Sequence, residues 1–337
     1  MAFLGISEFK WFVGVVEDRH DPEKLGRLRV RCLGIHTGDK TKIATADLPW
    51  ASVSLPTTAS GISGLGQSPS FIVEGSWVWG YFRDGNDLLQ ELVVIGTLPG
   101  RPSELGNPDK GFYDPNRRDP INEDKPDYKI SVYPKEKEEP DTNRLAVNNP
   151  DKEHSTLTAR KAARELNIPT ADFDEVGSNI KASDTDNWSQ PDISYKAVYP
   201  YNHVFESESG HIREYDDSFT IDEDGIRHNH YRIHERHTSG TSYEIDTAGN
   251  RIDLNTASYF NITNADNKHY IKGNSDITID GRHKVYINKS GTEDNNYDIQ
   301  VGPNANVNIQ VDNGNLNVVT KTGQFNFDVG SDFNCNV

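Results

Sequence analysis

The most constraining feature of the chain is a repeated pattern at its C-terminal end, from about Tyr270 to Val337. Short runs there alternate apolar and polar residues, and Gly and Asn separate one run from the next. Alternation with a period of two places Ile, Val and Phe on one face of a strand and the polar residues on the other. Such strands at near-regular spacing predict a repeat architecture. The runs are Asp276–Asp280, His283–Asn288, Tyr297–Val301, Asn306–Val311, Phe325–Val329 and Phe333–Val337.

The spacing of the turns limits how these strands can pack. Gly273 and Gly281 lie eight residues apart, so each unit holds one short strand and a turn. One such strand per unit is too little for a single chain to enclose a packed interior, whereas several copies wound together can enclose one. We therefore infer an intertwined homotrimer, a β-helix in the form of a triangular prism; the alternative is the edge of an ordinary β-sandwich. The apolar stripe that would fill the prism, here called the tail stripe, consists of Ile277, Ile279, Val285, Ile287, Val307, Ile309, Val311, Phe325, Phe327 and Val329.

Composition favours an all-β protein that buries surface between subunits. Only 34% of the 337 residues are hydrophobic and the mean hydropathy is −0.73, which is low for a compact globule. A single Met and an abundance of Asn, Asp, Ser and Thr disfavour a helical fold. The net charge of −17 disfavours binding to phosphates, so no nucleic-acid partner is expected.

Targeting and redox signals are few. The two cysteines, Cys32 and Cys335, cannot form a disulfide framework. The first residues carry no basic segment followed by the apolar stretch of a signal peptide, and no run of about 18 apolar residues occurs. We expect a protein made in a cytosol that reaches other places only as part of a larger assembly.

Five alternating runs in residues 1–100 predict a small β-barrel. No helix signal interrupts them, and this many strands in this length suits the oligonucleotide/oligosaccharide-binding (OB) type. The second run alternates strictly, so Arg27, Arg29 and Arg31 share the face opposite its apolar residues. The runs are Phe12–Val16, Arg27–Leu33, Trp50–Leu55, Ser76–Phe82 and Glu91–Gly96.

Three further segments complete the predicted organisation. Residues 101–198 are rich in Pro and charge, which predicts an extended linker with one short helix over 155–167. Short β segments return over 199–268 and predict a neck that leads into the spike, residues 269–337. Within the neck we expect strands near 199–205, 211–215, 241–245 and 251–254.

Two long stretches resemble a known family. Trp11–Arg31 resembles the start of the OB domain in the baseplate central spike (cell-puncturing) protein of contractile-tailed, T-even-like phages. Tyr199–Asp217 resembles the entry into the β-helix of that family, and Leu48–Val53 and Val73–Val78 fall at matching places. The resemblance covers about two thirds of the chain in the same order.

The resemblance implies a role and partners in the virion. It implies a trimer in the tail baseplate, made in the host cytoplasm, that docks through its barrels below a hub protein and pierces the host outer envelope when the sheath contracts. Contact with the host outer membrane would be transient, and the linker would contact neighbouring baseplate proteins. The expected hub-docking residues are Arg27, Arg29, Arg31 and Trp50. The expected seat of a small tip protein with proline-alanine-alanine-arginine (PAAR) repeats is Phe333, Cys335 and Val337.

An enzymatic role is not expected. The T-even spike carries a helical lysozyme domain between barrel and β-helix, whereas this chain has about 98 Pro- and charge-rich residues there. Glu153 and Glu165 have no surrounding core that would raise a carboxyl pKa for general-acid catalysis, so no catalytic residue is assigned. The alternatives are a peptidoglycan or glycan hydrolase of the tail tip and a type VI secretion spike of the valine-glycine repeat type. The second alternative is weaker because the barrel starts near residue 9, without the hub domain that those spikes carry before it.

Two groups of side chains offer other chemistry. Trp11, Trp50, Trp77 and Trp79 are candidate stacking platforms for a polymer, or they fill the barrel or a subunit seam. His228-Asn-His230 places two imidazoles on one face of a strand, and three chains around an axis would offer six nitrogens to an ion trapped there. The alternative is solvated loop histidines, and neither a cofactor nor a metal is expected.

Overall fold

We describe a computed structural model of the chain. It describes residues 10–85, 88–101, 138–149, 195–287 and 297–331, with the single positions 103, 112 and 333. The chain separates into two units, Met1–Asp276 and Ile277–Val337, which are considered one at a time. The expected helix over 155–167 lies outside the described residues. Among the residues that are described, no helix has the length and hydropathy needed to cross a bilayer.

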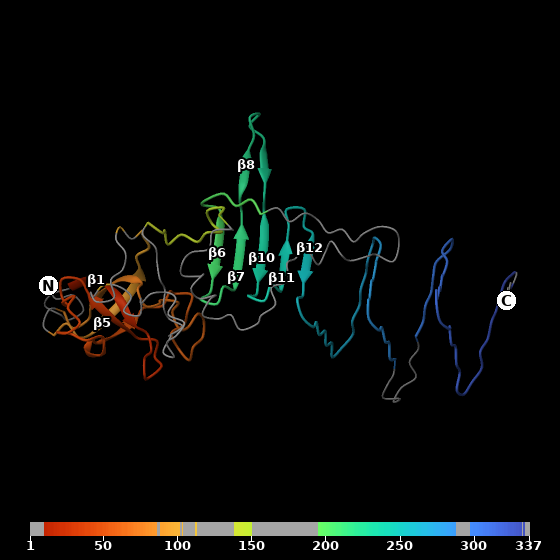
Figure 1. The fold of residues 1–337 in the computed structure, drawn as a ribbon, viewed down its shortest axis with the longest axis horizontal. Helices are drawn as coiled ribbons and strands as arrows, with labels where there is room; N and C mark the ends of the chain where they lie inside the picture. The colour runs from red at the N-terminus through yellow and green to blue at the C-terminus, as the bar shows by residue number, and fades with distance from the viewer. Residues whose placement is uncertain are drawn as a thin grey trace. The chain divides into compact units, whose positions relative to one another are not determined.

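The N-terminal strands close into a five-stranded barrel (Figure 1). The strand order is β1-β2-β3-β5-β4, with β1 paired to β4 to complete the circle. All pairings are antiparallel except β3 with β5, which is parallel. The five expected strands and the OB barrel are thus confirmed. The elements are β1 (Lys10–Asp18), β2 (Leu28–Cys32), the short 3₁₀ helix η1 (Thr45–Asp47), β3 (Trp50–Val53), β4 (Trp77–Phe82) and β5 (Leu92–Thr97).

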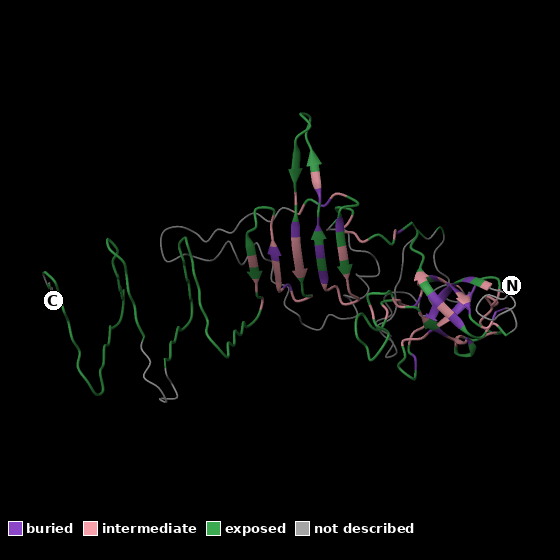
Figure 2. Ribbon diagram, turned by 180° about the vertical axis from the view of Figure 1, so that it is seen from behind, coloured by how far each residue is buried: buried purple, intermediate pink, exposed green. Residues whose placement is uncertain are grey.

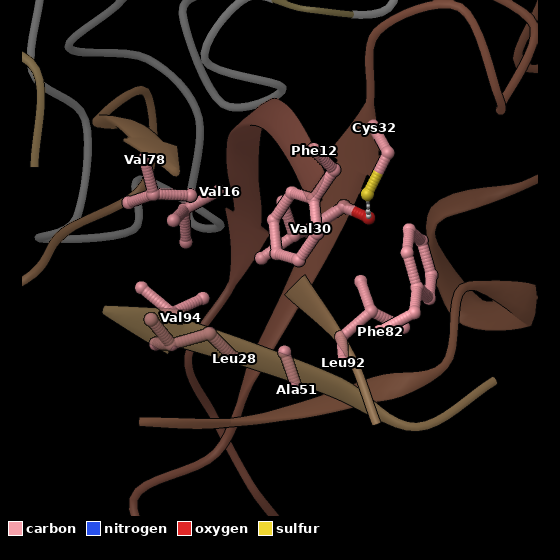
Figure 3. Packing of buried hydrophobic residues seen from close by; sticks show 10 residues of the cluster. All are labelled: Phe12, Val16, Leu28, Val30, Cys32, Ala51, Val78, Phe82, Leu92 and Val94. Carbon is pink, nitrogen blue, oxygen red and sulfur yellow. Dashed lines mark hydrogen bonds between the residues drawn. The ribbon is translucent and has the colours of Figure 1, made fainter. Parts of the chain in front are cut away.

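The barrel interior holds one apolar cluster (Figure 3). Every barrel strand contributes alternate residues to it, as the period-two pattern predicts. The Phe12 and Phe82 rings meet at 5.2 Å, and burial of each such large side chain stabilises the fold by about 1.5–3 kcal/mol. The cluster is Phe12, Val16, Leu28, Val30, Cys32, Ala51, Val78, Phe82, Leu92 and Val94. Burial raises the pKa of the Cys32 thiol to about 12, which makes it unreactive.

Gly80 is required where β4 pairs with β5, at a register shift between Trp79 and Gly80. A Cβ atom at this position would overlap the carbonyl oxygen of Val93 and press against the Phe12 ring. Gly80→Ala is therefore expected to lower the free energy of unfolding of the barrel by about 1–3 kcal/mol, as overpacking of a tight site does. Urea unfolding followed by tryptophan fluorescence measures this change. Gly100→Ala is the matched control, because a Cβ there meets nothing within 4 Å, and an equal loss in both variants would contradict the prediction.

A five-stranded antiparallel sheet follows, in the order β12-β11-β10-β7-β6, and a two-stranded hairpin, β8–β9, extends between β7 and β10 (Figure 1). The four strands expected in the neck are β6, β7, β11 and β12, and β9 corresponds to the strand expected at His228-Asn-His230. β8 and β10 were not expected. The strands are β6 (Asn202–Glu206), β7 (Ile212–Asp216), β8 (Phe219–Ile221), β9 (Arg227–Asn229), β10 (Arg232–Arg236), β11 (Ser242–Ile245) and β12 (Arg251–Leu254).

The central strands of this sheet bury charge rather than apolar side chains. Glu214, His234 and Glu244 face one another across β7, β10 and β11. Arg232 lies between the two carboxylates, with N–O distances of 2.7 Å to Glu214 and 3.1 Å to Glu244. His234 Nδ1 lies 2.8 Å from Glu214, and this imidazole with Arg232 lowers the pKa of the Glu214 carboxyl although burial opposes the shift. β10 escapes prediction because its buried residue is Arg232 and the next residue on that face is the half-buried His234, and neither carries an apolar signal.

Residues 138–149, part of the expected extended linker, contain turns and bends that contact the edge strand β6. Figure 2 shows that the strands of this sheet carry both buried and exposed residues. Leu145 is buried, and its carbonyl accepts hydrogen bonds from Asn202 Nδ2 and from the Tyr195 hydroxyl. Asn143 Nδ2 donates to Glu206 at 2.7 Å. The segment thus covers part of the β6 edge of the sheet.

The second unit, Ile277–Val337, has no internal strand pairing among its described residues. Its chain runs back and forth in extended segments joined by turns (Figure 1), and its described side chains are exposed. The apolar side chains of the unit are therefore left uncovered by the single chain.

Candidate functional site

The three arginines of β2 have different environments although they share one face. Arg31 is fully buried, with Nε 2.6 Å from Glu17 Oε1, and it also donates to the carbonyls of Thr37 and Ile43. Its guanidinium thus holds the loop after β2 against the outside of the barrel. The assignment of Arg31 to hub docking is corrected, because its own chain encloses it.

Arg27 is joined to the loop between β1 and β2. It donates two hydrogen bonds to the Asp21 carboxylate, from Nε at 3.0 Å and from Nη2 at 2.8 Å. Asp21 also accepts the backbone N–H groups of Glu23, Leu25 and Arg27. The Arg27 guanidinium, with these N–H groups, holds the pKa of the Asp21 carboxyl well below its usual range. Asp21 therefore organises the loop as a carboxylate.

Asp21→Asn is expected to weaken the barrel in a pH-dependent way. At neutral pH the loss of a charged acceptor for several donors should cost about 1–3 kcal/mol of unfolding free energy. Because the folded pKa of Asp21 lies below its unfolded value, its contribution is complete above about pH 4 and is lost as the pH falls toward the folded pKa. The difference in unfolding free energy between wild type and variant should therefore narrow as the pH falls from about 4 to about 3 in urea unfolding curves. A gap that widens on acidification would contradict this assignment.

Arg29 and Trp50 form a stacked pair on the barrel surface. The Arg29 guanidinium lies 4.5 Å from the centroid of the Trp50 ring, a cation–π distance. Arg29 also donates to the carbonyls of Thr45 and Ala46 and so fixes η1. Both side chains keep partial exposure, and with Arg27 they remain predicted hub-docking residues.

The barrel carries an exposed aromatic surface, as the stacking-platform and subunit-seam interpretations both require. Trp11 of β1 lies 5.4 Å from Trp79 and 6.1 Å from Tyr81, both on β4. Trp11 is 54% exposed, so the interpretation that the tryptophans fill the barrel is wrong. The lack of a side chain at Gly96 leaves room for the Trp79 indole. The alternation along β4 indicates this outward direction. Val78, Gly80 and Phe82 point inward, so the aromatic residues between them point outward.

The histidines of the neck do not converge on one site. His228, on β9, lies 2.8 Å from Asp222, and His230 lies 3.0 Å from the Thr220 hydroxyl. His234 bonds Glu214 in the sheet, and the His237 ring lies 4.5 Å from that of His211. Within one chain, His228 and His230 thus contact different partners, and an ion shared between three chains stays a prediction.

The tail stripe is exposed at all ten positions. The exposed fractions run from 44% at Val329 to 77% at Ile277. Phe333 is also exposed, and its ring lies 5.8 Å from that of Phe327, which in turn lies 4.7 Å from Phe325. Cys335 and Val337, expected to seat a tip protein with Phe333, lie outside the described residues. Glu153 and Glu165 lie outside them as well.

Comparison of the chain with known proteins identifies its family. A family model described as the Gp5 N-terminal OB domain matches residues 34–188. Protein Gp5 of Vibrio phage KVP40 is 36% identical over 317 residues, which cover 86% of this chain and 68% of that protein. The chain belongs to the Gp5 family. The pre-baseplate central spike protein Gp5 of Enterobacteria phage T4 is 44% identical over 119 residues, which cover 34% of this chain and 20% of that protein.

Membership of the Gp5 family confirms the resemblance drawn from Trp11–Arg31 and Tyr199–Asp217. It agrees with the closed five-stranded barrel and the nearly all-strand structure. The chain shares about two thirds of the length of the KVP40 Gp5 protein but only a fifth of that of the T4 protein. Much of the T4 Gp5 protein therefore has no aligned counterpart in this chain.

Proposed function

We propose that this member of the Gp5 family is the structural central spike of a phage tail baseplate. The observation that carries the proposal is the tail stripe, whose ten apolar side chains are at least 44% exposed in one chain. Contiguous exposed apolar surface on this scale marks an interface. The name of the T4 relative supports a spike as the assembly that buries it.

The partner that best suits the tail stripe is two further copies of the same chain. Each extended segment of residues 277–331 has one apolar face and no strand partner among the described residues. Three copies wound together would join their strands into ladders and turn the apolar faces inward, which leaves no open edge. Unfolding would require all three chains to unwind, so such a β-helix would resist heat and detergent kinetically.

The spike would act mechanically. Its barrels would dock below the tail hub through Arg27, Arg29 and Trp50, which lie together on the barrel surface. The C-terminal end near Phe333 would seat a small PAAR-like tip protein. Sheath contraction would then push the assembly through the host outer membrane. The aromatic surface of Trp11, Trp79 and Tyr81 suits a seam between subunits better than a nucleic-acid platform, because the chain carries a net charge of −17.

Sedimentation of the full chain tests the proposal. We expect a single species at three times the 37.8 kDa of one chain, stable to dilution. A monomer would leave the tail stripe without a partner and would overturn the spike. Immunogold labelling of intact phage should place the chain at the baseplate end of the tail, and labelling of the head or fibres would also refute the proposal.

We further propose that the spike has no muramidase activity of its own. About 98 Pro- and charge-rich residues occupy the place between barrel and neck, which is less than a helical lysozyme domain needs. Zymography of the purified chain against bacterial sacculi tests this point. A clearing band would favour the hydrolase alternative, and its loss in Glu153→Gln or Glu165→Gln would identify the general acid.

A further inference from the structure

A small polar cluster lies outside the barrel, at the point where β1 ends. Asp18 is the last residue of β1, His20 follows in the loop, and Glu74 precedes β4. Their ligand-type atoms all lie within 4.8 Å of one another. Within the part of the chain that is described, this is the one such grouping of three His, Cys, Asp or Glu residues.

The backbone fixes the cluster in place. The ladder between β1 and β2 shifts register between Val16 and Asp18, which turns the end of β1 outward. Opposite, Gly75 N–H donates to the Val16 carbonyl at 2.9 Å, and Val16 N–H donates to the Ser76 carbonyl at 3.0 Å. Glu74 is thus pinned against the end of β1 by hydrogen bonds on its C-terminal side.

Glu74 is buried with a carboxylate that no hydrogen bond satisfies. The residue is 1% exposed, and neither Oε1 nor Oε2 accepts a hydrogen bond from the described residues. The Nε of Arg19 lies 3.3 Å from Oε2, but Arg19 directs both terminal nitrogens to Glu208, at 2.9 and 2.8 Å. A buried carboxylate without hydrogen bonds costs free energy, so a proton or a cation in addition to Arg19 would stabilise Glu74.

The orientation of the side chains favours a cation. Each carboxylate has one oxygen toward an arginine, since Asp18 Oδ2 lies 3.8 Å from Arg29 Nε and Glu74 Oε2 faces Arg19. The other oxygen of each faces His20 Nδ1, at 3.1 Å for Asp18 and 3.5 Å for Glu74. In metal sites, the carboxylate oxygen that does not bind the metal usually interacts with a neighbouring group, which orients the carboxylate.

The distances select the class of ion. Ligands about 2.0–2.2 Å from a metal stand about 3.0–3.5 Å apart in octahedral or tetrahedral sites, which the separations of 3.1 and 3.5 Å match. One imidazole nitrogen with two carboxylate oxygens suits Zn²⁺ and its first-row neighbours rather than Ca²⁺ or Mg²⁺, which take oxygen ligands. The His20 side chain is 64% exposed, so water can complete the coordination.

The geometry points to a structural binding site for a first-row transition dication, formed by Asp18, His20 and Glu74. The ion would link the end of β1 to the loop before β4. This link lies beside the Arg19–Glu208 ion pair, which joins the barrel to the turn between β6 and β7. The inference does not depend on the spike function.

The test uses the full-length chain after chelator treatment and dialysis. Calorimetric titration with ZnCl₂ should show one site per chain, and CoCl₂ should produce d–d absorption with an intensity that reports four- to six-fold coordination. Zn²⁺ should also raise the temperature of the barrel transition, which tryptophan fluorescence follows. Excess Mg²⁺ or Ca²⁺ should not displace the Co²⁺ signal.

Variants decide whether these three residues hold the ion. His20→Ala, at an exposed position that should fold normally, is expected to weaken Zn²⁺ binding at least tenfold and to abolish the Co²⁺ spectrum. Glu74→Gln should act in the same way if it folds. His228→Ala is the matched control, since His228 also faces one carboxylate at 2.8 Å but has no second one, and it should bind as wild type does. Absence of binding, or equal binding by wild type and His20→Ala, would overturn the site.

Discussion

Replacing Ile309 by Asp is expected to abolish the trimer. Ile309 lies in the middle of the tail stripe and is 70% exposed in the single chain. In a three-chain prism the substitution would place three carboxylates together in an apolar interior, and each unpaired buried charge costs several kcal/mol. Sedimentation at micromolar concentration should then show mainly single chains where the wild type shows trimers. Resistance to SDS without boiling should be lost as well.

The neighbouring residue supplies the control for this experiment. Asn308 precedes Ile309 and by alternation lies on the opposite face. Asn308→Asp adds the same charge with almost no change of shape, so a prism with Ile309 inside should remain trimeric. Identical behaviour of the two variants, whether both trimeric or both dissociated, would contradict the predicted direction of the tail stripe.

Arg31→Met is expected to lower the free energy of unfolding of the barrel by about 3–5 kcal/mol. The substitution leaves the fully buried Glu17 carboxylate without its main partner, and removal of one member of a buried pair has a cost of this size. The carbonyls of Thr37 and Ile43 lose a donor too. Tryptophan fluorescence in urea should report the change, because four of the five tryptophans, at 11, 50, 77 and 79, lie in the barrel.

Two further variants separate burial from pairing. Arg83→Met breaks an exposed ion pair with Glu91 of similar length, 2.8 Å, and should cost far less than Arg31→Met because solvent screens the exposed pair. The double variant Glu17→Gln/Arg31→Met removes both charges and should recover much of the stability that Arg31→Met loses. A loss in Arg31→Met no larger than that in Arg83→Met would show that the Glu17–Arg31 pair is not buried in solution.

Alternation along a strand predicted which residues share a face of that strand, but it did not predict which other segments of the chain cover that face. Arg29 and Arg31 occupy equivalent places on β2, yet only Arg31 is enclosed, because the loop after β2 folds back over it. A pattern within one strand contains no information about a loop several residues away. The same limit explains why the tail stripe could be read as one face of a strand while its partner could only be inferred.

Other features could not be predicted from the sequence because charged residues occupy their buried positions. β10 is the middle strand of the sheet, but Arg232 and His234 on its buried face read as surface residues. The Asp18–His20–Glu74 cluster was equally hidden, because Glu74 lies more than fifty residues from His20 and only the barrel fold brings them together. By contrast, the apolar face of β2 was predicted, because Leu28, Val30 and Cys32 alternate within that strand and all three lie in the barrel core.

In each of two stretches of the chain, the first and last residues are held close together. Gly100 N–H donates to Asp141 Oδ2 at 2.6 Å, and Asp141 N–H donates back to the Gly100 carbonyl at 3.1 Å, so residues 101–140 span two anchored ends. Tyr195 likewise donates its hydroxyl to the Leu145 carbonyl, which brings the two ends of residues 146–194 near each other. Segments whose ends meet can lengthen or shorten at little cost to the scaffold that holds them. Extra residues inserted at either point would therefore leave the barrel and the sheet unchanged.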